Sequence, residues 1–245
     1  MPTESKLTRR LRHGARLSER DIGQLETISA SAIDIVASTD LIKQHDVAKH
    51  AHIILDGVAC RYKFLRDGRR AIVALLLPGD FCDLQDSIQQ KMDHSIATLV
   101  DCRIAKLDKQ EITRLLESSP AIRRACLWAT MVEEATLREW LVNVGRRSSE
   151  EAVAHLFCEL DARLGAVGLA RGHVFYLPLT QATIADVIGI SAVHVQRVIA
   201  NLKDAGLIML QDRVLVIPDF ASLAEMADFD ETYLHLGNTV GPHEQ

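Results

Sequence analysis

The sequence predicts an α+β protein in which a compact β unit precedes a long helix and a small helical C-terminal domain. Three observations lead to this class. Short runs of β-forming residues between about 34 and 108 are separated by turn-forming dipeptides. Residues 121–144 contain neither glycine nor proline. Two helix-like segments then meet at Gly189, and two short apolar runs follow them directly.

The composition is that of a folded protein without a uniformly basic surface. The chain has 245 residues, of which 48% are hydrophobic and 25% charged, and its formal net charge is −5. A chain of this size can bury about 70% of its surface, so a core forms without disulfides or metals. The charge is uneven, because residues 1–20 hold six Lys or Arg and two Glu, whereas residues 218–245 hold six acids and no Lys or Arg.

The cysteines indicate a reducing compartment. There are five, an odd number, at least 20 residues apart: Cys60, Cys82, Cys102, Cys126 and Cys158. The chain has no apolar secretory segment at its start, so we expect reduced thiols in a cytoplasmic protein. The longest apolar run, residues 71–78, is far shorter than the roughly 20 residues that span a bilayer, and no membrane association is expected.

The N-terminal elements follow from caps and turns. Ser18, with Asp21 three positions on, favours a short helix. The expected strands occupy 51–55, 59–64, 71–77 and 96–107. The turns between them are Asp56-Gly57, Asp67-Gly68 and Pro78-Gly79-Asp80, which favour an antiparallel unit. Residues 109–118 return to helical spacing.

The long helix begins at Ser119-Pro120 and ends at Gly145. One apolar stripe along it is the predicted dimerisation surface: Ile122, Ala125, Ala129, Val132, Thr136 and Trp140. Other faces of the helix are apolar too, so it must be covered on more than one side; their residues are Cys126, Leu127, Trp128, Met131, Ala135, Leu137 and Leu141. We expect the β unit to cover one face and a second copy of the helix the other. Coverage of both faces within one monomer is the alternative.

After a helix capped by Ser148-Ser149 and running to about Leu164, the next segment predicts a helix-turn-helix. Thr180 caps its first helix, Gly189 permits the left-handed turn, and Ser191 caps its second helix. Val195 and Val198 fall on the face that packs back on the first helix. A helical hairpin used only for packing is the alternative interpretation.

The second helix would present hydrogen-bonding groups to base edges. Its first turns and outward face carry Ala192, Val193, His194, Gln196, Arg197 and Asn201. Arg197 suits a bidentate contact to guanine, Gln196 or His194 a second base, and Val193 a thymine methyl. Nearer the DNA backbone we expect phosphate contacts from Thr180, Gln181, Ser191 and Lys203.

A β-hairpin follows, with Gln211-Asp212 between the runs 206–210 and 213–217, and is interpreted as a wing. Asp219 caps a last helix that runs to about Phe229. The expected organisation is therefore a sensor-like domain at 1–118, a dimerisation helix at 119–146, a DNA-binding domain at 147–230 and an acidic tail at 231–245.

This order of elements resembles the Crp/Fnr family of bacterial transcription regulators over residues ~20–230. The segments Met92-Asp93-His94, Arg138-Glu139-Trp140-Leu141 and Leu177-Pro178-Leu179-Thr180-Gln181 are similar to an alphaproteobacterial subgroup. The resemblance implies a cyclic-nucleotide-binding-like β-roll, a dimerisation helix and a winged helix-turn-helix. It also implies a cytoplasmic homodimer on a palindromic promoter site in double-stranded DNA, with RNA polymerase as a partner if the protein is an activator.

The family's effector sites are altered. Its cAMP-binding members use Gly-Glu and Arg-Ser pairs, where this chain has Gly79-Asp80 and Met92-Asp93. Between 71 and 102 the only basic side chain is Lys91, among Asp80, Asp83, Asp86 and Asp93. A buried cyclic phosphate needs a cation, so cAMP is not expected.

Other members of the family hold an iron–sulfur cluster or a haem. Iron–sulfur members use N-terminal cysteines, and residues 1–59 contain none, so a cluster is not expected. Haem binding is one alternative, with His94 or the group His45, His50 and His52 as candidate axial ligands. The simpler interpretation is that these histidines are solvated or hydrogen-bonded locally. For Cys, inert buried thiols are the simpler reading too.

The base-reading pattern also departs from that of FNR-type members, which read DNA with Glu and then Ser-Arg. This chain keeps Arg197 but has Val193 and Gln196 in their place, so the family's consensus operator cannot be transferred intact. We expect a signal at the β-roll to change the pairing of the long helices, or constitutive activity.

Two functions from other classes compete with a regulator. One is an enzyme with a metal site in the histidine-rich β unit, but no HExxH, CxxC, Walker or GxSxG spacing supports it, and no catalytic activity is expected. The other is a ligand-binding module whose C-terminal helices make protein contacts.

Overall fold

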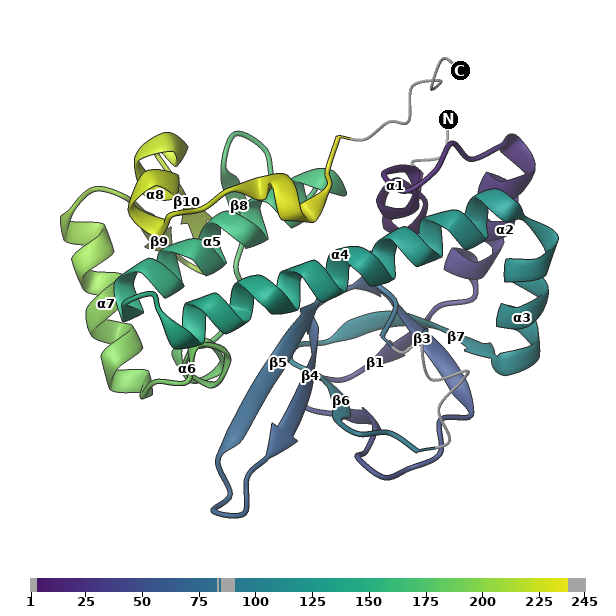
Figure 1. The fold of residues 1–245 in the computed structure, drawn as a ribbon, viewed down its shortest axis with the longest axis horizontal. Coiled ribbons are helices and arrows are strands. Elements are labelled where there is room, and N and C mark those ends of the chain that lie inside the picture. The colour runs from purple at the N-terminus through teal and green to yellow at the C-terminus, as the bar shows by residue number, and fades with distance from the viewer. Residues whose placement is uncertain (1–3, 83, 85–90, 238–245) are drawn as a thin grey trace. The chain divides into compact units, whose positions relative to one another are not determined.

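The computed structural model describes residues 4–82, 84 and 91–237 (Figure 1). Its contacts divide the chain into two compact units, and each is described by itself. The first comprises the described residues of Met1–Lys63, Ala74–Glu133 and His235–Gln245. The second comprises Phe64–Val73 and Glu134–Leu234, so that helix α4 (Pro120–Gly145) contributes to both.

The first unit is built from two antiparallel sheets and a group of helices. Its elements are α1 (Lys6–Arg12), α2 (Glu19–Ala30), β1 (Ile33–Ile35), β2 (Asp40–Ile42), β3 (His50–Asp56), β4 (Ala59–Phe64), β5 (Arg70–Leu76), β6 (Ser95–Thr98), β7 (Cys102–Asp108) and α3 (Lys109–Ser118). The last residue of β4 and residues 70–73 of β5 are counted with the second unit. The sheets have the orders β1-β7-β3 and β2-β6-β4-β5. The predicted antiparallel β unit is thus confirmed.

The alternation of side chains along β3 and β7 places these strands between two layers. Ala51, Ile53 and Leu55 of β3 belong to a core that includes residues of α1, α2, α3 and the start of α4. Ile54, between them, belongs to a second core with residues of the four-stranded sheet, such as Ile96. The three-stranded sheet therefore has helices on one face and the other sheet on its opposite face. Figure 1 shows α1, α2 and α3 gathered around the first turns of α4.

The expected single strand at 96–107 is wrong, because this stretch forms two strands. Residues 99–101 turn between them: the amides of Leu99 and Val100 donate to the carbonyl of Val58, and an Asp101 carboxylate oxygen accepts from the Ala37 amide. β6 then lies in the four-stranded sheet and β7 in the three-stranded one. The apolar pattern of the sequence does not reveal this change of sheet, because the strands on both sides of the break are buried and apolar.

Caps fix the helix starts that the sequence predicts. The Ser18 and Asp21 capping box is present, with the Ser18 amide 2.8 Å from an Asp21 carboxylate oxygen. The helix α1 was not predicted, since four of its seven residues are basic. Ser5 caps it, and Leu7 and Leu11 anchor it in the core.

The second unit surrounds α5, which contacts α6, α7 and α8. Its elements besides α4 are α5 (Ser149–Ala166), β8 (Val174–Tyr176), α6 (Gln181–Ile188), α7 (Ala192–Asp204), β9 (Met209–Gln211), β10 (Val214–Val216), α8 (Phe220–Ala227) and the 3₁₀ helix η2 (Glu231–Leu234). The sheet has the order β8-β10-β9, so β8 adds a strand to the predicted hairpin.

Part of the expected acidic tail is packed into this unit. Residues 231–234 form η2, and Leu234 is completely buried, because the tail carries apolar side chains that the count of acids overlooks. Residues 238–245 lie outside the described residues.

No single helix in the described chain is long and apolar enough to cross a bilayer. By length and composition α6 and α7 pass that test only together, as a pair bent by 101°.

Candidate nucleic-acid interface

The first helix of the candidate interface is fixed by its ends. The Thr180 hydroxyl oxygen accepts a hydrogen bond from the Thr183 amide at 3.0 Å. At the other end Gly189 has φ 84° and ψ 26°, and its amide donates to the Ala185 carbonyl at 2.8 Å. A side chain at Gly189 would be strained in this left-handed conformation, so glycine ends the helix and turns the chain.

The second helix starts two residues later. The Ser191 hydroxyl oxygen accepts from the His194 amide at 3.2 Å and so caps α7. The angle of 101° between α6 and α7 lies within the range of helix-turn-helix motifs. Val195 and Val198 on α7, and Ile184 and Ile188 on α6, are all buried. The predicted helix-turn-helix is confirmed in its caps, its turn and its packing.

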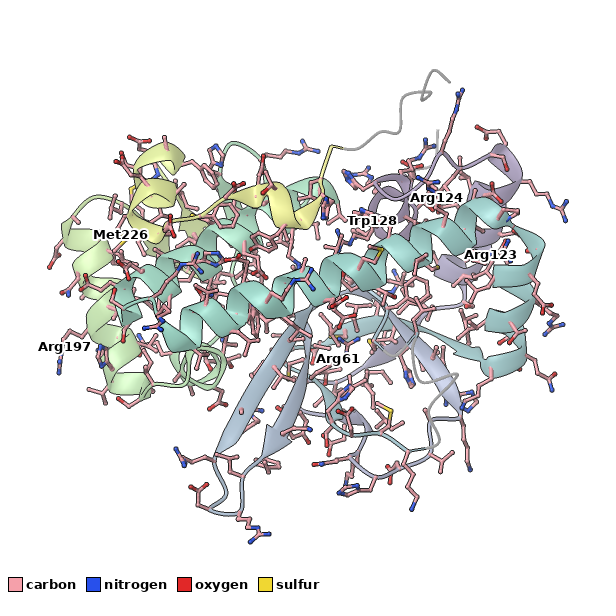
Figure 2. The ribbon with its side chains drawn as sticks, in the orientation of Figure 1. Arg61, Arg123, Arg124, Trp128, Arg197 and Met226 are labelled. Carbon is pink, nitrogen blue, oxygen red and sulfur yellow. The ribbon has the colours of Figure 1, made fainter. Side chains whose placement is uncertain are left out.

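The outward face of α7 lies opposite its buried stripe. At 100° per residue, Val193, Arg197 and Ala200 point away from Val195 and Leu202. Val193 is 68% exposed although it is apolar, which leaves its methyl groups free to contact a ligand. Figure 2 shows Arg197 on the outer side of α7. All ten predicted DNA-contacting residues are exposed: Thr180, Gln181, Ser191, Ala192, Val193, His194, Gln196, Arg197, Asn201 and Lys203.

Besides the capping residues Thr180 and Ser191, Asn201 and Lys203 bond to other elements of the second unit. The Asn201 side-chain amide donates to a carboxylate oxygen of Glu150 on α5 at 2.5 Å. The Lys203 ammonium donates to the carbonyl of Leu210 on β9 at 2.9 Å. These contacts orient α7 against α5 and the wing, and leave Val193, Gln196 and Arg197 exposed on its outward side.

The wing turns one residue later than predicted. Asp212 and Arg213 have φ 50° and 62°, as the two central residues of a tight hairpin turn do. Val214 pairs with Gln211 across this turn. Arg213, exposed at the tip, was not among the predicted contact residues. A basic residue in a two-residue hairpin turn was the sequence signal that could have identified it.

The other face of the helix-turn-helix carries an ion pair. Asp186 on α6 accepts from Arg70 at 2.8 Å, and both side chains are about one-third exposed. This pairing offsets the negative charge of a carboxylate on α6.

The predicted dimerisation stripe of α4 packs inside its own chain. Ile122, Ala125 and Val132 are buried, and the first two belong to the core of the first unit. Trp140 is buried as well and donates to Glu159 at 2.9 Å, while Ala129 and Thr136 are partly buried. The most apolar stripe of the helix is therefore the one that its own domains cover.

A different stripe of α4 is exposed. Leu127, Met131 and Leu141 are 61%, 58% and 72% exposed. Glu134 and Arg138 lie between them on the same face and form an ion pair at 2.9 Å. The spacing of these five positions, four then three residues, is that of a coiled-coil seam.

The fold and this surface together define a winged helix-turn-helix protein joined to a β domain through a long helix. Residues 151–226 match the Crp-like helix-turn-helix domain, and residues 34–119 match the cyclic nucleotide-binding domain. The chain belongs to the Crp/Fnr family of transcriptional regulators, and with its helix-turn-helix it is a DNA-binding member.

Named relatives cover most of the chain. It is 31% identical over 171 residues to the nitrogen fixation regulation protein FixK of Bradyrhizobium diazoefficiens, covering 69% of this chain and 70% of that one. It is 28% identical to the transcriptional activator protein FnrL of Cereibacter sphaeroides, covering 88% of both. The solved structure of FixK2 from Bradyrhizobium japonicum shares the fold, with a TM-score of 0.70 and 22% identity over 80% of this chain and 96% of that one.

In the β domain, the positions that the resemblance assigns to the cyclic phosphate carry Met92 and Asp93. Met92 is buried in the apolar core, and the Asp93 side chain is two-thirds exposed beside His94. The Asp80 carboxylate accepts hydrogen bonds from Arg10 and from the Leu77 amide, so both of its oxygens already have partners within the protein. Of the carboxylates named in the sequence argument, Asp83 and Asp86 lie outside the described residues.

The nearby cations are paired within the protein. Arg61 donates to the Cys82 carbonyl at 2.8 Å and forms an ion pair with Glu133 of α4 (Figure 2). Lys63 lies 3.7 Å from an Asp93 carboxylate oxygen. A cyclic phosphate would have to compete with these carboxylates for both cations.

His50 and His52 lie two positions apart on β3, and His94 lies next to β6. No group of three or more His, Cys, Asp or Glu side chains among the described residues could hold a metal ion. The ring of His94 bonds Asp93 at 2.6 Å, and burial lowers its pKa. All five cysteines are buried thiols outside any disulfide.

Proposed function

We propose that the protein acts as a homodimer that binds a palindromic promoter site, with α7 of each copy in the major groove. The observation that supports this most directly is the exposed face of α7, which offers Arg197, Gln196 and Val193 beside a wing that carries Arg213. Arginine pairs with guanine and valine packs on a thymine methyl, so this face has the chemistry for base reading. The proposed activity is binding, and no catalytic step is assigned to it.

The proposed pairing surface is the exposed stripe of α4, in place of the stripe that the sequence suggested. Leu127, Met131 and Leu141 would pack against their counterparts in a second copy. Glu134 and Arg138 would lie inside the seam, where charged residues fix register and orientation at some cost in stability. A twofold axis through this seam would present the two α7 helices to half-sites about 34 Å apart.

The proposed regulator does not respond to cAMP. The paired cations and the buried Met92 support this, and activity without a small effector is consistent with the Arg61–Glu133 pair that already joins β4 to α4. We assign no iron–sulfur cluster, and haem ligation stays open. Because its ligand is promoter DNA, we place the protein in the cytoplasm. FnrL is named a transcriptional activator, and an activator of this kind would contact RNA polymerase.

The test begins with selection of binding sites from genomic fragments by the full-length protein at physiological salt. Fluorescence anisotropy then compares the selected palindrome with random DNA for the parent and for Arg197→Ala. We expect the substitution to cost about 1–3 kcal/mol on the selected site and much less on random DNA. Arg171→Ala, which removes the same charge outside the helix-turn-helix and the wing, is the matched control.

Two results would overturn the proposal. One is the absence of any site bound more tightly than random DNA. The other is an equal loss on specific and random DNA for Arg197→Ala, which would make Arg197 a phosphate contact and remove the proposed base reading.

A further inference from the structure

The junction between α4 and α5 is covered by a segment from the end of the C-terminal unit. Residues 146–148 join the two helices, and residues 228–234 lie against them. The path of the chain in Figure 1 shows η2 beside α5. We refer to residues 228–234 as the C-terminal clasp. All of the contacts below lie within the second unit.

The first attachment of the clasp is made by Arg147. Its side chain is 9% exposed, and its guanidinium donates to the Asp228 backbone carbonyl at 2.9 Å. The same group donates to Glu139 at 3.1 Å and to the Asn143 side chain at 2.8 Å, both in the last turns of α4. One planar guanidinium thus joins the end of α4, the junction and the first residue of the clasp.

The second attachment is the buried carboxylate of Glu159 on α5. One of its oxygens accepts from the Trp140 indole of α4 at 2.9 Å and from the Tyr233 hydroxyl of the clasp at 3.1 Å. The other oxygen accepts from Arg163 at 2.9 Å. A carboxylate with no exposed surface is costly to bury, and these donors offset that cost only while α4, α5 and η2 keep this arrangement.

Aromatic packing fills the space between the two attachments. The fully buried ring of His155 on α5 has Phe229 edge-on at 5.1 Å and Tyr233 stacked at 6.0 Å between ring centroids. The Asn143 side chain of α4 lies 3.3 Å from the same ring. Removal of the clasp would therefore open a cavity between α4 and α5.

We propose that the C-terminal clasp fixes the angle between α4 and α5, and that Tyr233 and Arg147 are positioning residues for the recognition helices. The proposal rests on the proposed dimeric function. In a dimer joined along α4, this angle determines how far apart the two α7 helices lie and how firmly that distance is held. A rigid junction favours binding to one half-site spacing. A flexible junction allows binding at several spacings, but it must become ordered each time, which costs conformational entropy.

The experiment measures tolerance to half-site spacing. Affinities are determined by anisotropy for the selected palindrome and for versions with the half-sites moved by one or two base pairs. The parent is expected to discriminate strongly between them. Tyr233→Phe removes only the hydroxyl and is expected to reduce this discrimination by about fivefold, the effect of one lost hydrogen bond. Arg147→Gln removes the guanidinium that bonds Asp228, Glu139 and Asn143, and is expected to reduce the discrimination by at least as much.

Tyr176→Phe is the matched control, since Tyr176 is an exposed tyrosine on β8 of the same unit. We expect it to leave the discrimination unchanged. A single half-site should be bound equally by the parent and by Tyr233→Phe, because α7 itself is intact. Hydrogen exchange of the amides of 146–148 should be faster in Tyr233→Phe, which also tests the proposal if that variant binds DNA poorly.

Loss of affinity by the same factor at every spacing would show that Tyr233 only stabilises the fold, and would overturn the inference. So would unchanged exchange at the junction in Tyr233→Phe. These failures differ from a failure of the proposed function, in which the parent itself would have no preferred palindrome.

Discussion

The buried ring of His155 makes the stability of the C-terminal unit depend on pH in a calculable way. Burial, and then the charge of Arg147, lower the pKa of His155 from 6.5 to about 3. The unfolded chain binds a proton at this residue near pH 6.5, whereas the folded chain stays neutral until far lower pH. Acid therefore favours unfolding through His155. Its contribution is complete above about pH 6.5 and is lost as the pH falls from there toward 3.

The magnitude follows from proton linkage. At pH 5 the unfolded residue is almost fully protonated and the folded one is neutral, whereas at pH 7 both are mostly neutral. Lowering the pH from 7 to 5 should cost about 2 kcal/mol of unfolding free energy through this one ring. The figure depends little on the folded pKa, provided that the pKa stays well below 5.

Urea unfolding at pH 7, 6 and 5, at fixed protein concentration and salt, measures the effect. His155→Gln replaces the ring by an amide that does not titrate, so it should remove about 2 kcal/mol of the pH dependence whatever it does to stability at pH 7. Subtracting the two profiles cancels the other histidines. Parallel profiles for the parent and His155→Gln would refute the reasoning, as would an NMR titration that shows His155 protonated at pH 6.

Three further predictions concern the pairing surface, the effector and the thiols. Leu141→Arg should weaken the dimer at least tenfold in sedimentation analysis, whereas Leu169→Arg, at another exposed leucine, should not; a stable dimer of Leu141→Arg would exclude the proposed seam. Millimolar cAMP should change neither the melting temperature nor the DNA affinity, and a clear rise in either would restore the cyclic-nucleotide site. Burial raises the pKa of Cys126 and Cys158 from 9.0 to about 12, which lowers their thiolate fraction roughly 1000-fold. Disulfide reagents should therefore label both only after denaturation, and rapid labelling of the native protein would contradict their burial.

The candidate site was predictable wherever local chemistry decides the structure. Thr180 and Ser191 cap their helices through their own hydroxyls, and Gly189 turns the chain because of its own conformational freedom. Each effect acts within four residues, so the sequence contains the whole cause. The exposed position of Arg197 follows from the same short-range periodicity.

Roles that depend on distant partners were not predictable in this way. The Asn201 side chain is of a type that can read bases, but its amide donates to Glu150, which lies 51 positions away. Arg213 became a candidate only when the wing was seen to turn at Asp212 and Arg213. In both cases the deciding contact or register is set by the fold.

The amino-acid sequence by itself determined the order of the elements and the two-helix motif with its glycine turn, because each depends on residue type and near neighbours. Tertiary structure alone decided which stripe of α4 stays exposed, since periodicity shows that two faces are apolar but not which one the chain covers. It also decided that Tyr233 reaches Glu159 across 74 positions. Burial is a property of the assembled chain, and no local pattern contains it.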